Sequence, residues 1–236
     1  MCSSDLASFL TLFPYLPVIF FAATVPTPMR AAAITLWVVL FPNNVGQMAA
    51  FGFVQRALWQ DGRLLATYKE GRARLNAYLD DHAFLLLAAL ELLQARFDAG
   101  TLRFAQSLAQ AMLARFADPA GGFYFTADDH ETLIARMKPL ADNATPSGNG
   151  VAALALGRLS VVTGELAYAE AARAAVVAAM PAMRDTPAAH ATLLMALAET
   201  LSPPRSVVLQ GEAAPLAGWR SRLGGRYLPE IGRAHV

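Results

Sequence analysis

The sequence predicts an all-α fold in which helical hairpins stack side by side and curve into part of a ring, with a small β insertion. From about Gln47 onward, Ala- and Leu-rich segments carry apolar residues at helical spacing. These segments come in pairs joined by tight turns, and one member of each pair is the more apolar. Each more apolar member also begins with polar residues. Such pairs bury their apolar faces only against neighbouring pairs, so several must stack.

Composition sets the limits of the interpretation. The chain has 236 residues, of which 56% are hydrophobic and 16% charged, and its formal net charge is +1. This length suits one or two domains. The absence of a basic run argues against a nucleic-acid surface, so we expect no nucleic-acid partner. The single cysteine, Cys2, excludes disulfides and cysteine-based metal or redox motifs. We expect no metal and no cofactor.

The two ends read as translated sequencing adapter. The residues 1–6 are "MCSSDL" and the residues 231–236 are "IGRAHV". Codons that encode the first segment have a reverse complement that encodes the Ile-Gly-Arg-Ala-His of the second. We therefore expect both segments to be adapter-derived, which would make the chain a fragment with arbitrary break points.

Residues 7–46 form an apolar segment of uncertain origin. Phe9–Val25 is near the lower limit of about 17–25 residues for a membrane span, and Ala31–Phe41 is too short. A degenerate membrane hairpin, a signal-like segment and an out-of-frame or chimeric translation are the alternatives. No basic residue precedes Arg30, which disfavours a signal peptide. We favour the artefact over membrane contact by residues 9–41 and expect a cytoplasmic protein, with membrane association as the alternative.

The next segments alternate clear helices with short extended pieces. Residues 47–60 read as a helix stopped by Asp61-Gly62, and residues 63–68 as a short strand. Residues 78–97 form a strong helix whose two leading aspartates suit the positive N-terminal dipole. After a short turn, residues 101–117 form its partner.

The second half begins with a turn and a brief aromatic strand within residues 118–129. A polar stretch, "MKPLADNATPSGNG", then leads into a helix over 147–163, and Gly164 turns the chain into a helix over 166–180. Another helix starts at 187 and ends at Pro203-Pro204, before a strand-like run over 205–211. We expect the starts of the more apolar helices to share one mouth, where free N–H groups can bind oxygen-rich ligands.

Four segments carry a resemblance to a known family. They are "DGRLLATYKEGRARLNAYLDDHAFLLLAALELLQ", "GGFYFT", "RMKPLADNATPSGNGVAALALGRLSVVTGE" and "PPRSVVLQG". In this order they resemble the C-terminal half of the spermatogenesis-associated protein 20-like proteins, over about residues 47–230. The resemblance implies a thioredoxin-like domain, absent from this chain, joined to a six-hairpin (α/α)6 toroid. That toroid is similar to N-acylglucosamine 2-epimerases and six-hairpin glycosidases, and about half of it remains here.

The resemblance implies carbohydrate chemistry at the mouth of the ring. Sugar epimerases of this fold move a proton with histidines, which suits a side chain with a near-neutral pKa. The candidate catalytic residues are His190, His82 and Asp81, although the family often has tyrosine where His82 stands. Each histidine could instead cap a turn. A glycosidase would need two carboxylates about 5–10 Å apart, for which Asp81 and Asp142 are candidates, unless they serve as a helix cap and a loop acceptor.

The candidate substrate-binding residues share the polar stretch and its flanks. They are Arg136, Lys138, Asp142, Ser147, Asn149 and Tyr124. The two basic residues could hold a phosphate or carboxylate, or pair with Asp81 or Asp142. Tyr124, with its aromatic neighbours, could stack on a sugar or pack on the helices. Ser147 lacks a nucleophile-elbow context, and the "PSGNG" run is not a phosphate-binding Walker loop.

We therefore expect a fragment of a carbohydrate-processing or carbohydrate-binding toroid domain, inactive alone because half a ring leaves its pocket open to water. Its partners would be a sugar or sugar-phosphate ligand and, in the full-length parent, the thioredoxin-like domain. The alternative is a non-catalytic scaffold that positions that domain. Fold alone does not decide between the two.

Overall fold

The computed structural model describes residues 45–130, 134–202, 205–209, 211, 213–224 and 231–235. The adapter-like start and nearly all of the apolar segment, up to residue 44, lie outside the described residues.

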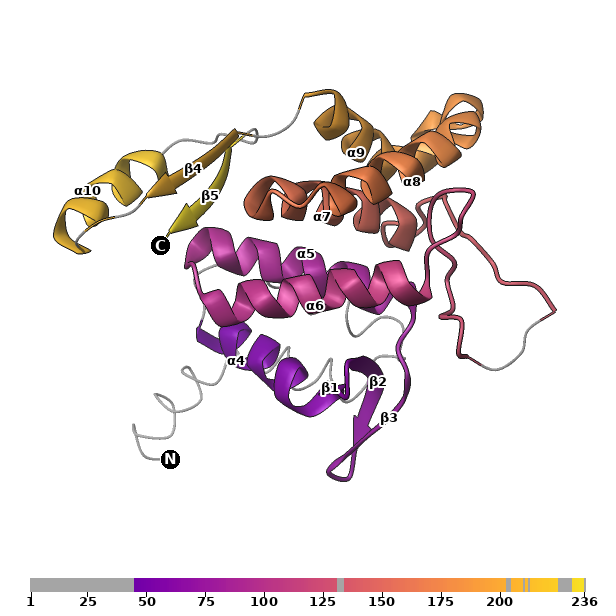
Figure 1. The fold of residues 1–236 in the computed structure, drawn as a ribbon, viewed down its shortest axis with the longest axis horizontal. Helices are drawn as coiled ribbons and strands as arrows, with labels where there is room; N and C mark the ends of the chain where they lie inside the picture. The colour runs from indigo at the N-terminus through magenta and orange to yellow at the C-terminus, as the bar shows by residue number, and fades with distance from the viewer. Residues whose placement is uncertain are drawn as a thin grey trace, which may run out of the picture.

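The described chain is mostly helical and its helices pack in two layers (Figure 1). The main helices are α5 (Leu79–Ala95), α6 (Ala99–Arg115), α7 (Gly148–Thr163), α8 (Leu166–Asp185) and α9 (Ala191–Leu201). Helix α7 packs between α5 and α9, whereas α6 packs on α5 and α8 packs on α7. The two predicted hairpins, α5 with α6 and α7 with α8, are therefore present, and the mainly-α prediction is confirmed.

Local signals account for most helix boundaries. The Asp98 side chain accepts from the Thr101 N–H at 2.7 Å and starts α6, while Gly164, at φ +76°, ends α7. Helix α8 runs beyond the predicted residue 180 to Asp185 although Pro181 lies inside it. Met183, which is buried in the core, holds this last turn against the other helices. Tertiary packing here outweighs the hydrogen bond that a proline removes.

The three more apolar helices begin at the same end of the molecule. A Cβ atom on Gly148, at the start of α7, would lie 1.9 Å from Asp80 Oδ1, at the start of α5. A Cβ atom on Gly150 would lie 2.9 Å from the Cβ of Thr192, at the start of α9. Helices α5, α7 and α9 are therefore neighbours with adjacent N-terminal ends, as the pairing in the sequence predicted.

A small antiparallel sheet precedes these helices. Helix α4 (Val45–Phe53) continues into a π-helical turn, Val54–Leu58, and then into β1 (Trp59–Gln60), β2 (Arg63–Lys69) and β3 (Arg72–Asn76). The predicted helix over 47–60 is therefore wrong at its end. Asp61 and Gly62 have φ of +50° and +74° and form a two-residue hairpin turn that pairs Trp59 with Leu64. Strand β3 was not predicted.

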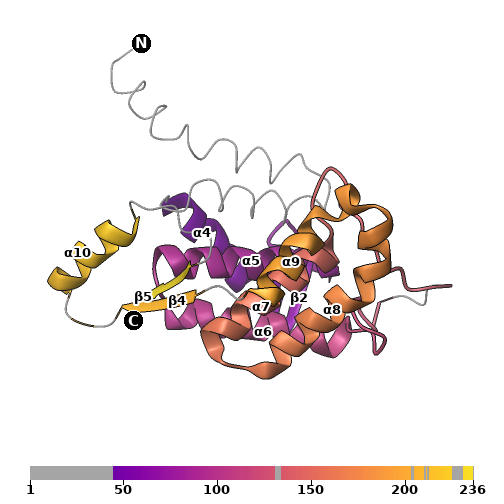
Figure 2. The ribbon, with the colours of Figure 1, turned by 90° about the horizontal axis from the view of Figure 1, so that it is seen from above.

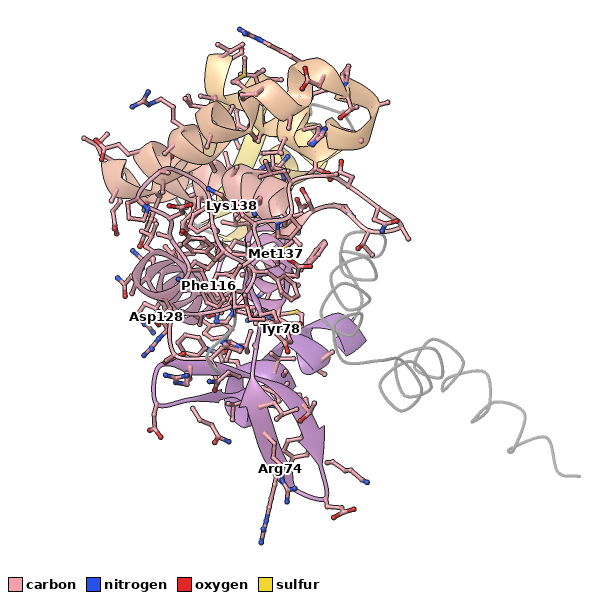
Figure 3. The ribbon with its side chains drawn as sticks, turned by 90° about the vertical axis from the view of Figure 1, so that its right-hand side faces the viewer. Arg74, Tyr78, Phe116, Asp128, Met137 and Lys138 are labelled. Carbon is pink, nitrogen blue, oxygen red and sulfur yellow. The ribbon has the colours of Figure 1, made fainter. Side chains whose placement is uncertain are left out.

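The segment between α6 and α7 lies over the starts of the inner helices (Figure 3). The Leu79 N–H donates to the Phe125 carbonyl at 3.0 Å, and the Phe125 N–H donates to the Met137 carbonyl at 2.8 Å. The predicted aromatic strand is reduced to one bridge, between Ala117 and Phe123. The end at which we expected an open mouth is thus largely covered by this segment.

The C-terminal elements are β4 (Arg205–Leu209), α10 (Ala213–Gly224) and β5 (Ile231–His235). Strand β4, which lies in the predicted strand-like run, pairs in parallel with β5 from the adapter-like end. Helix α10 was not predicted and stands apart from the two helix layers (Figure 2). Within the described residues, no helix combines the length and apolarity that crossing a lipid bilayer requires.

Candidate functional site

Asp81 and His82 occupy the first turn of α5, and both are buried. The Asp81 carboxylate accepts from the Tyr78 N–H at 2.9 Å and so satisfies a backbone donor at the start of the helix. Burial, with a smaller contribution from the neighbouring Asp80, raises the pKa of Asp81 to about 7 against the lowering effect of that hydrogen bond. His82 Nδ1 lies 2.8 Å from the Tyr78 carbonyl, so Nδ1 carries the proton of the neutral ring. Burial lowers the pKa of His82 to about 4.

Asp80, which the sequence argument set aside, is a second unusual carboxyl group. Its Oδ1 atom is buried against Gly148 and has no hydrogen-bond partner. Burial raises its pKa to about 6. Burial of this unpartnered oxygen disfavours the ionised form, which is why the pKa lies above that of an exposed aspartate.

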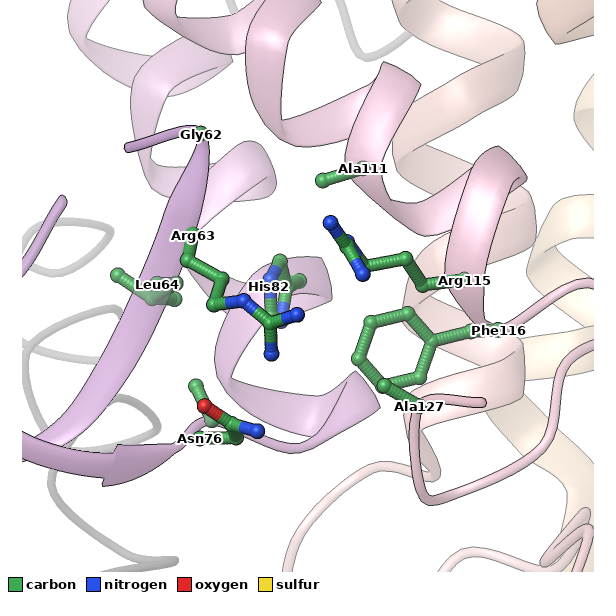
Figure 4. A pocket seen from close by; sticks show the side chains of 10 residues that line it. Gly62, Arg63, Leu64, Asn76, His82, Ala111, Arg115, Phe116 and Ala127 are labelled. Carbon is green, nitrogen blue, oxygen red and sulfur yellow. The ribbon is translucent and has the colours of Figure 1, made fainter. Parts of the chain in front are cut away.

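A pocket opens beside His82, between β2, β3 and α6 (Figure 4). Its lining residues are Gly62, Arg63, Leu64, Asn76, Ala77, His82, Ala111, Arg115, Phe116 and Ala127. The His82 ring lies 4.9 Å from the Phe116 ring, centroid to centroid. With Nδ1 engaged, His82 Nε2 is a hydrogen-bond acceptor. No hydrogen bond among the described residues uses it.

Two arginines from different elements meet at this pocket. Arg63 begins β2 and Arg115 ends α6, and both guanidinium groups bind the same carboxylate oxygen, Asp129 Oδ2. Arg115 Nη1 also lies 3.9 Å from Asp128. In Figure 4 the two arginine side chains extend toward each other over His82. The sequence argument missed these arginines, since Arg63 and Asp129 lie 66 residues apart and no local pattern connects them.

His130 joins the neighbouring aromatic group rather than lying in solvent. Its Nδ1 accepts from the Ala127 N–H at 3.0 Å, and its Nε2 is buried without a partner. The His130 ring stacks on Tyr78 at 5.2 Å between centroids, and Tyr78 stacks on Phe125 at 4.7 Å. Phe125 is therefore packed, not offered to a ligand.

Asn149 is fully buried at the start of α7. Its Oδ1 accepts from the Phe123 N–H at 2.8 Å, and its Nδ2 donates to the Phe123 and Pro139 carbonyls at 2.9 and 3.0 Å. These hydrogen bonds fix the segment between α6 and α7, called here the covering segment, to the start of α7. They use the acceptor and both donors of the amide.

Lys138 and Arg136 bind the covering segment itself. Lys138 Nζ lies 2.6 Å from Asp118 Oδ2 and 2.8 Å from the Gly121 carbonyl. Arg136 donates to the carbonyls of Thr126 and Arg115, at 3.2 and 3.0 Å. The expected pairing of either residue with Asp81 or Asp142 is therefore wrong.

Tyr124 lies under the same two cations. The Arg136 guanidinium is 4.2 Å from the centre of its ring, and Lys138 Nζ is 5.8 Å away. These cation–π contacts cover the face that a sugar ring would need.

Asp142 and Ser147 connect the starts of α7 and α9. Asp142 accepts from the N–H groups of Ser147 and Thr192, each at 2.8 Å, and the Ser147 side chain accepts from the Gly150 N–H at 3.2 Å. His190, at the start of α9, is buried, and its Nδ1 lies 2.8 Å from the Thr186 carbonyl. The structure thus gathers the predicted residues at one end of the molecule, in separate hydrogen-bonded groups.

Metal-ligating residues do not cluster in the described part of the chain: no group of three or more His, Cys, Asp or Glu side chains there could hold an ion.

No family model matches the sequence. Three curated relatives do match, namely spermatogenesis-associated protein 20 of Mus musculus, of Rattus norvegicus and of Homo sapiens. Each is 29% identical over 137 residues, which is 57% of this chain. Over this stretch the chain is distantly similar to spermatogenesis-associated protein 20. The match spans only 17% of the length of each relative. The activities and partners of those longer proteins therefore do not transfer directly to this chain.

Proposed function

We propose that the described residues are part of an (α/α)6 toroid that binds or processes carbohydrate at the N-terminal ends of its inner helices. The supporting observation is that α5, α7 and α9 begin side by side, with the His82 pocket at this end. In an ordered ring of hairpins, the inner helices share one mouth, and polar side chains at their starts face a common ligand.

His82 and Asp81 are the two candidates for proton transfer in this proposal. The His82 ring is neutral at pH 7 because its pKa is about 4, and Nδ1 is held by the Tyr78 carbonyl. Nε2 is then a base directed to the pocket. Asp81, beside it with a pKa of about 7, is positioned to hold or release a proton near neutral pH. His190 keeps its proposed catalytic role only if a ligand reaches the α9 start.

The domain would act within a longer cytoplasmic protein that also contains a thioredoxin-like domain. Spermatogenesis-associated protein 20 is much longer than this chain, which supports the idea of a larger parent. We propose that this chain alone is inactive, because a partial ring leaves its pocket open on one side.

Ligand titration of the complete parent protein tests the proposal. Aldoses, amino sugars and sugar phosphates are titrated by calorimetry, and epimerisation is followed by NMR of the sugar. Binding that is lost in H82Q but retained in H130Q would support the His82 pocket. Absence of binding and of turnover with every sugar class would overturn the carbohydrate proposal.

The second candidate function is a non-catalytic scaffold for the thioredoxin-like domain or its client. The supporting observation is that Asn149, Lys138 and Asp142 all form internal hydrogen bonds that fix the covering segment and the helix starts. Alanine variants of Asp81, Lys138 and Asn149 discriminate. Loss of folding without any specific ligand defect would favour the scaffold, whereas a folded variant with weaker sugar binding would favour the site.

A further inference from the structure

We propose that Arg63 and Arg115 form an oxyanion-binding site and that Asp129 occupies it as an internal ligand. The inference rests on the proposed carbohydrate function and narrows its ligand to an anionic sugar, either a sugar phosphate or a sugar acid. Arg63 was not among the residues that the sequence indicated, nor were Arg115 and Asp129.

Arg63 and Arg115 approach the same carboxylate from opposite sides of the pocket (Figure 4). They come from β2 and α6, and their guanidinium groups converge on one oxygen, Asp129 Oδ2. Guanidinium groups bind carboxylates and phosphates best in paired, two-oxygen contacts. Here two guanidiniums share a single oxygen of a single carboxylate. Most of their N–H donors are therefore available to a group with more oxygens, such as a phosphoryl group.

Two positive groups face Asp129, and the only further acidic group that the described residues bring near them is Asp128, 3.9 Å from Arg115. The Asp128 side chain is 58% exposed, so its attraction is weakened by water. The two carboxylates balance the two arginines formally, but only Asp129 does so at hydrogen-bonding distance. A phosphate, which carries more negative charge at neutral pH than a carboxylate, would neutralise the two guanidinium groups more fully.

The adjoining pocket combines polar groups with apolar surface. His82 offers an acceptor at Nε2, Asn76 offers an amide, and Phe116 and Leu64 provide apolar surface. An acceptor next to two cationic donors suits a molecule that carries a hydroxyl group close to an oxyanion. The free space is only about 10 Å³, which is about the room that one water molecule needs and far below the roughly 300–1,000 Å³ typical of ligand pockets. An external oxyanion would therefore enter by displacing the Asp129 carboxylate from the two arginines.

Asp129 is placed to compete with such a ligand. It lies in the segment that follows Phe123, and its side chain is 30% exposed. Among the described residues, its carboxylate pairs with the two arginines alone. If the internal carboxylate fills the site nine-tenths of the time, the apparent affinity for an external anion falls by about tenfold. Removing the carboxylate should restore that affinity.

Calorimetric titration of the full 236-residue chain in a low-salt, phosphate-free buffer tests the inference. The probes are glucose, glucose 6-phosphate, glucuronate and inorganic phosphate. We expect glucose 6-phosphate or glucuronate to bind, D129N to tighten that binding by about tenfold, and R115Q and R63Q to abolish it. Asp128→Asn is the matched control, because it removes the same charge from the neighbouring residue, and it should change the affinity by less than about twofold. R115K keeps the charge and serves if R115Q does not fold.

Each outcome has a distinct meaning. Binding of glucose alone, unaffected by the arginine variants, overturns the anion site and leaves the carbohydrate proposal standing. Inorganic phosphate binding as tightly as glucose 6-phosphate, with the same variant effects, supports the anion site and counts against a sugar ligand. The inference is overturned if neither the unsubstituted 236-residue chain nor folded D129N binds any anion. It is also overturned if D129N and D128N change the affinity equally.

Discussion

Three residues in the first turn of α5 have pKa values displaced by burial. Asp80 and Asp81 are raised to about 6 and about 7, and His82 is lowered to about 4. At pH 5 the folded chain holds two carboxyl protons at these sites, whereas the unfolded chain holds one imidazole proton, so folding takes up one proton. The stability supplied by the carboxyl groups is present at low pH and is lost as pH rises through their folded values. His82 acts oppositely and loses stability as pH falls from about 6.5 to about 4.

A prediction follows for Asp80→Asn. In the unsubstituted chain, the free energy of unfolding should fall by about 1.4 kcal/mol for each unit that pH rises between pH 4 and 6, because unfolding releases one net proton. In D80N the remaining carboxyl proton and the imidazole proton cancel, so stability should be flat in that window and higher than that of the unsubstituted chain at pH 8. Urea unfolding at several pH values measures this. Asp185→Asn, at an exposed position, is the control. Parallel curves for D80N and the unsubstituted chain would contradict the burial of Asp80.

Asn149 illustrates what residue-level reasoning could and could not obtain from the sequence. The run of small polar residues indicated a special helix start, and the structure indeed places Asn149 there. Its partners, Phe123 and Pro139, are 26 and 10 residues away, so the pattern around Asn149 could not show that its amide was already engaged. The same holds for Lys138, whose partner Asp118 lies 20 residues away.

Replacing Asn149 with alanine should destabilise the fold strongly. The change leaves the Phe123 N–H and two carbonyl groups buried without partners, with an expected loss of about 3 kcal/mol or more. Chemical denaturation followed by circular dichroism measures the loss. Asn143→Ala removes an amide from an exposed position in the same segment and should cost less than about 0.5 kcal/mol. Similar losses for the two variants would show that the amide of Asn149 is not the anchor of the covering segment.

At the scale of elements, periodicity was informative wherever a helix had a continuous apolar face. Helices α5, α6, α7 and α8 were all predicted, with boundaries shifted by a few residues. Strand β3 was missed because its exposed, arginine-rich sequence lacks an apolar alternation, and it forms only by pairing with β2 across the Glu70-Gly71 turn. Helix α8 was cut short at Pro181 because the buried contact of Met183 cannot be read locally.

The close approach of α5 and α7 can be tested at Gly148. A methyl group there would collide with Asp80 Oδ1, at 1.9 Å, so Gly148→Ala should cost about 1–3 kcal/mol. Adding Asp80→Ala should recover most of that loss, a non-additive result expected only for groups in contact. Gly157→Ala is the matched control within α7, because its nearest neighbour would be at 3.9 Å, and it should be neutral or stabilising. Additive energies for the Gly148 and Asp80 changes would contradict this helix packing.

At the scale of the whole molecule, the sequence predicted the order of hairpins and the common end of the inner helices. It could not predict that residues 117–130 and 134–147 would cover that end. The covering depends on backbone hydrogen bonds such as those of Leu79 and Phe125, which the residue types do not reveal. The pocket beside His82 likewise depends on β2, α5 and α6 coming together. Three elements distant in sequence cannot be assembled from local patterns.

The last prediction concerns the outer side of α9. This helix buries Leu193 and Ala196 against its neighbours, but Met195 on its outer side is 53% exposed, and Leu201 at its C-terminal end is 77% exposed. In the proposed ring, the next hairpin would cover an apolar face of this kind, since the α5 and α7 faces are covered in that way here. Without that hairpin, the face should bind the dye ANS and promote association of the chain as concentration rises.

Charge placed on that face should reverse both effects. We expect M195E and L201E together to lower ANS fluorescence and shift the chain toward monomer in sedimentation velocity, with the helical circular dichroism unchanged. Val177→Glu is the control, because Val177 is comparably exposed on α8, which would lie on the outside of the ring. Equal changes in ANS fluorescence and sedimentation for the α9 and α8 variants would mean that the exposed side of α9 promotes association no more than α8 does. That outcome would contradict the assignment of α9 as an inner helix that a further hairpin covers. It would also contradict the proposal that the hairpins extend into a ring.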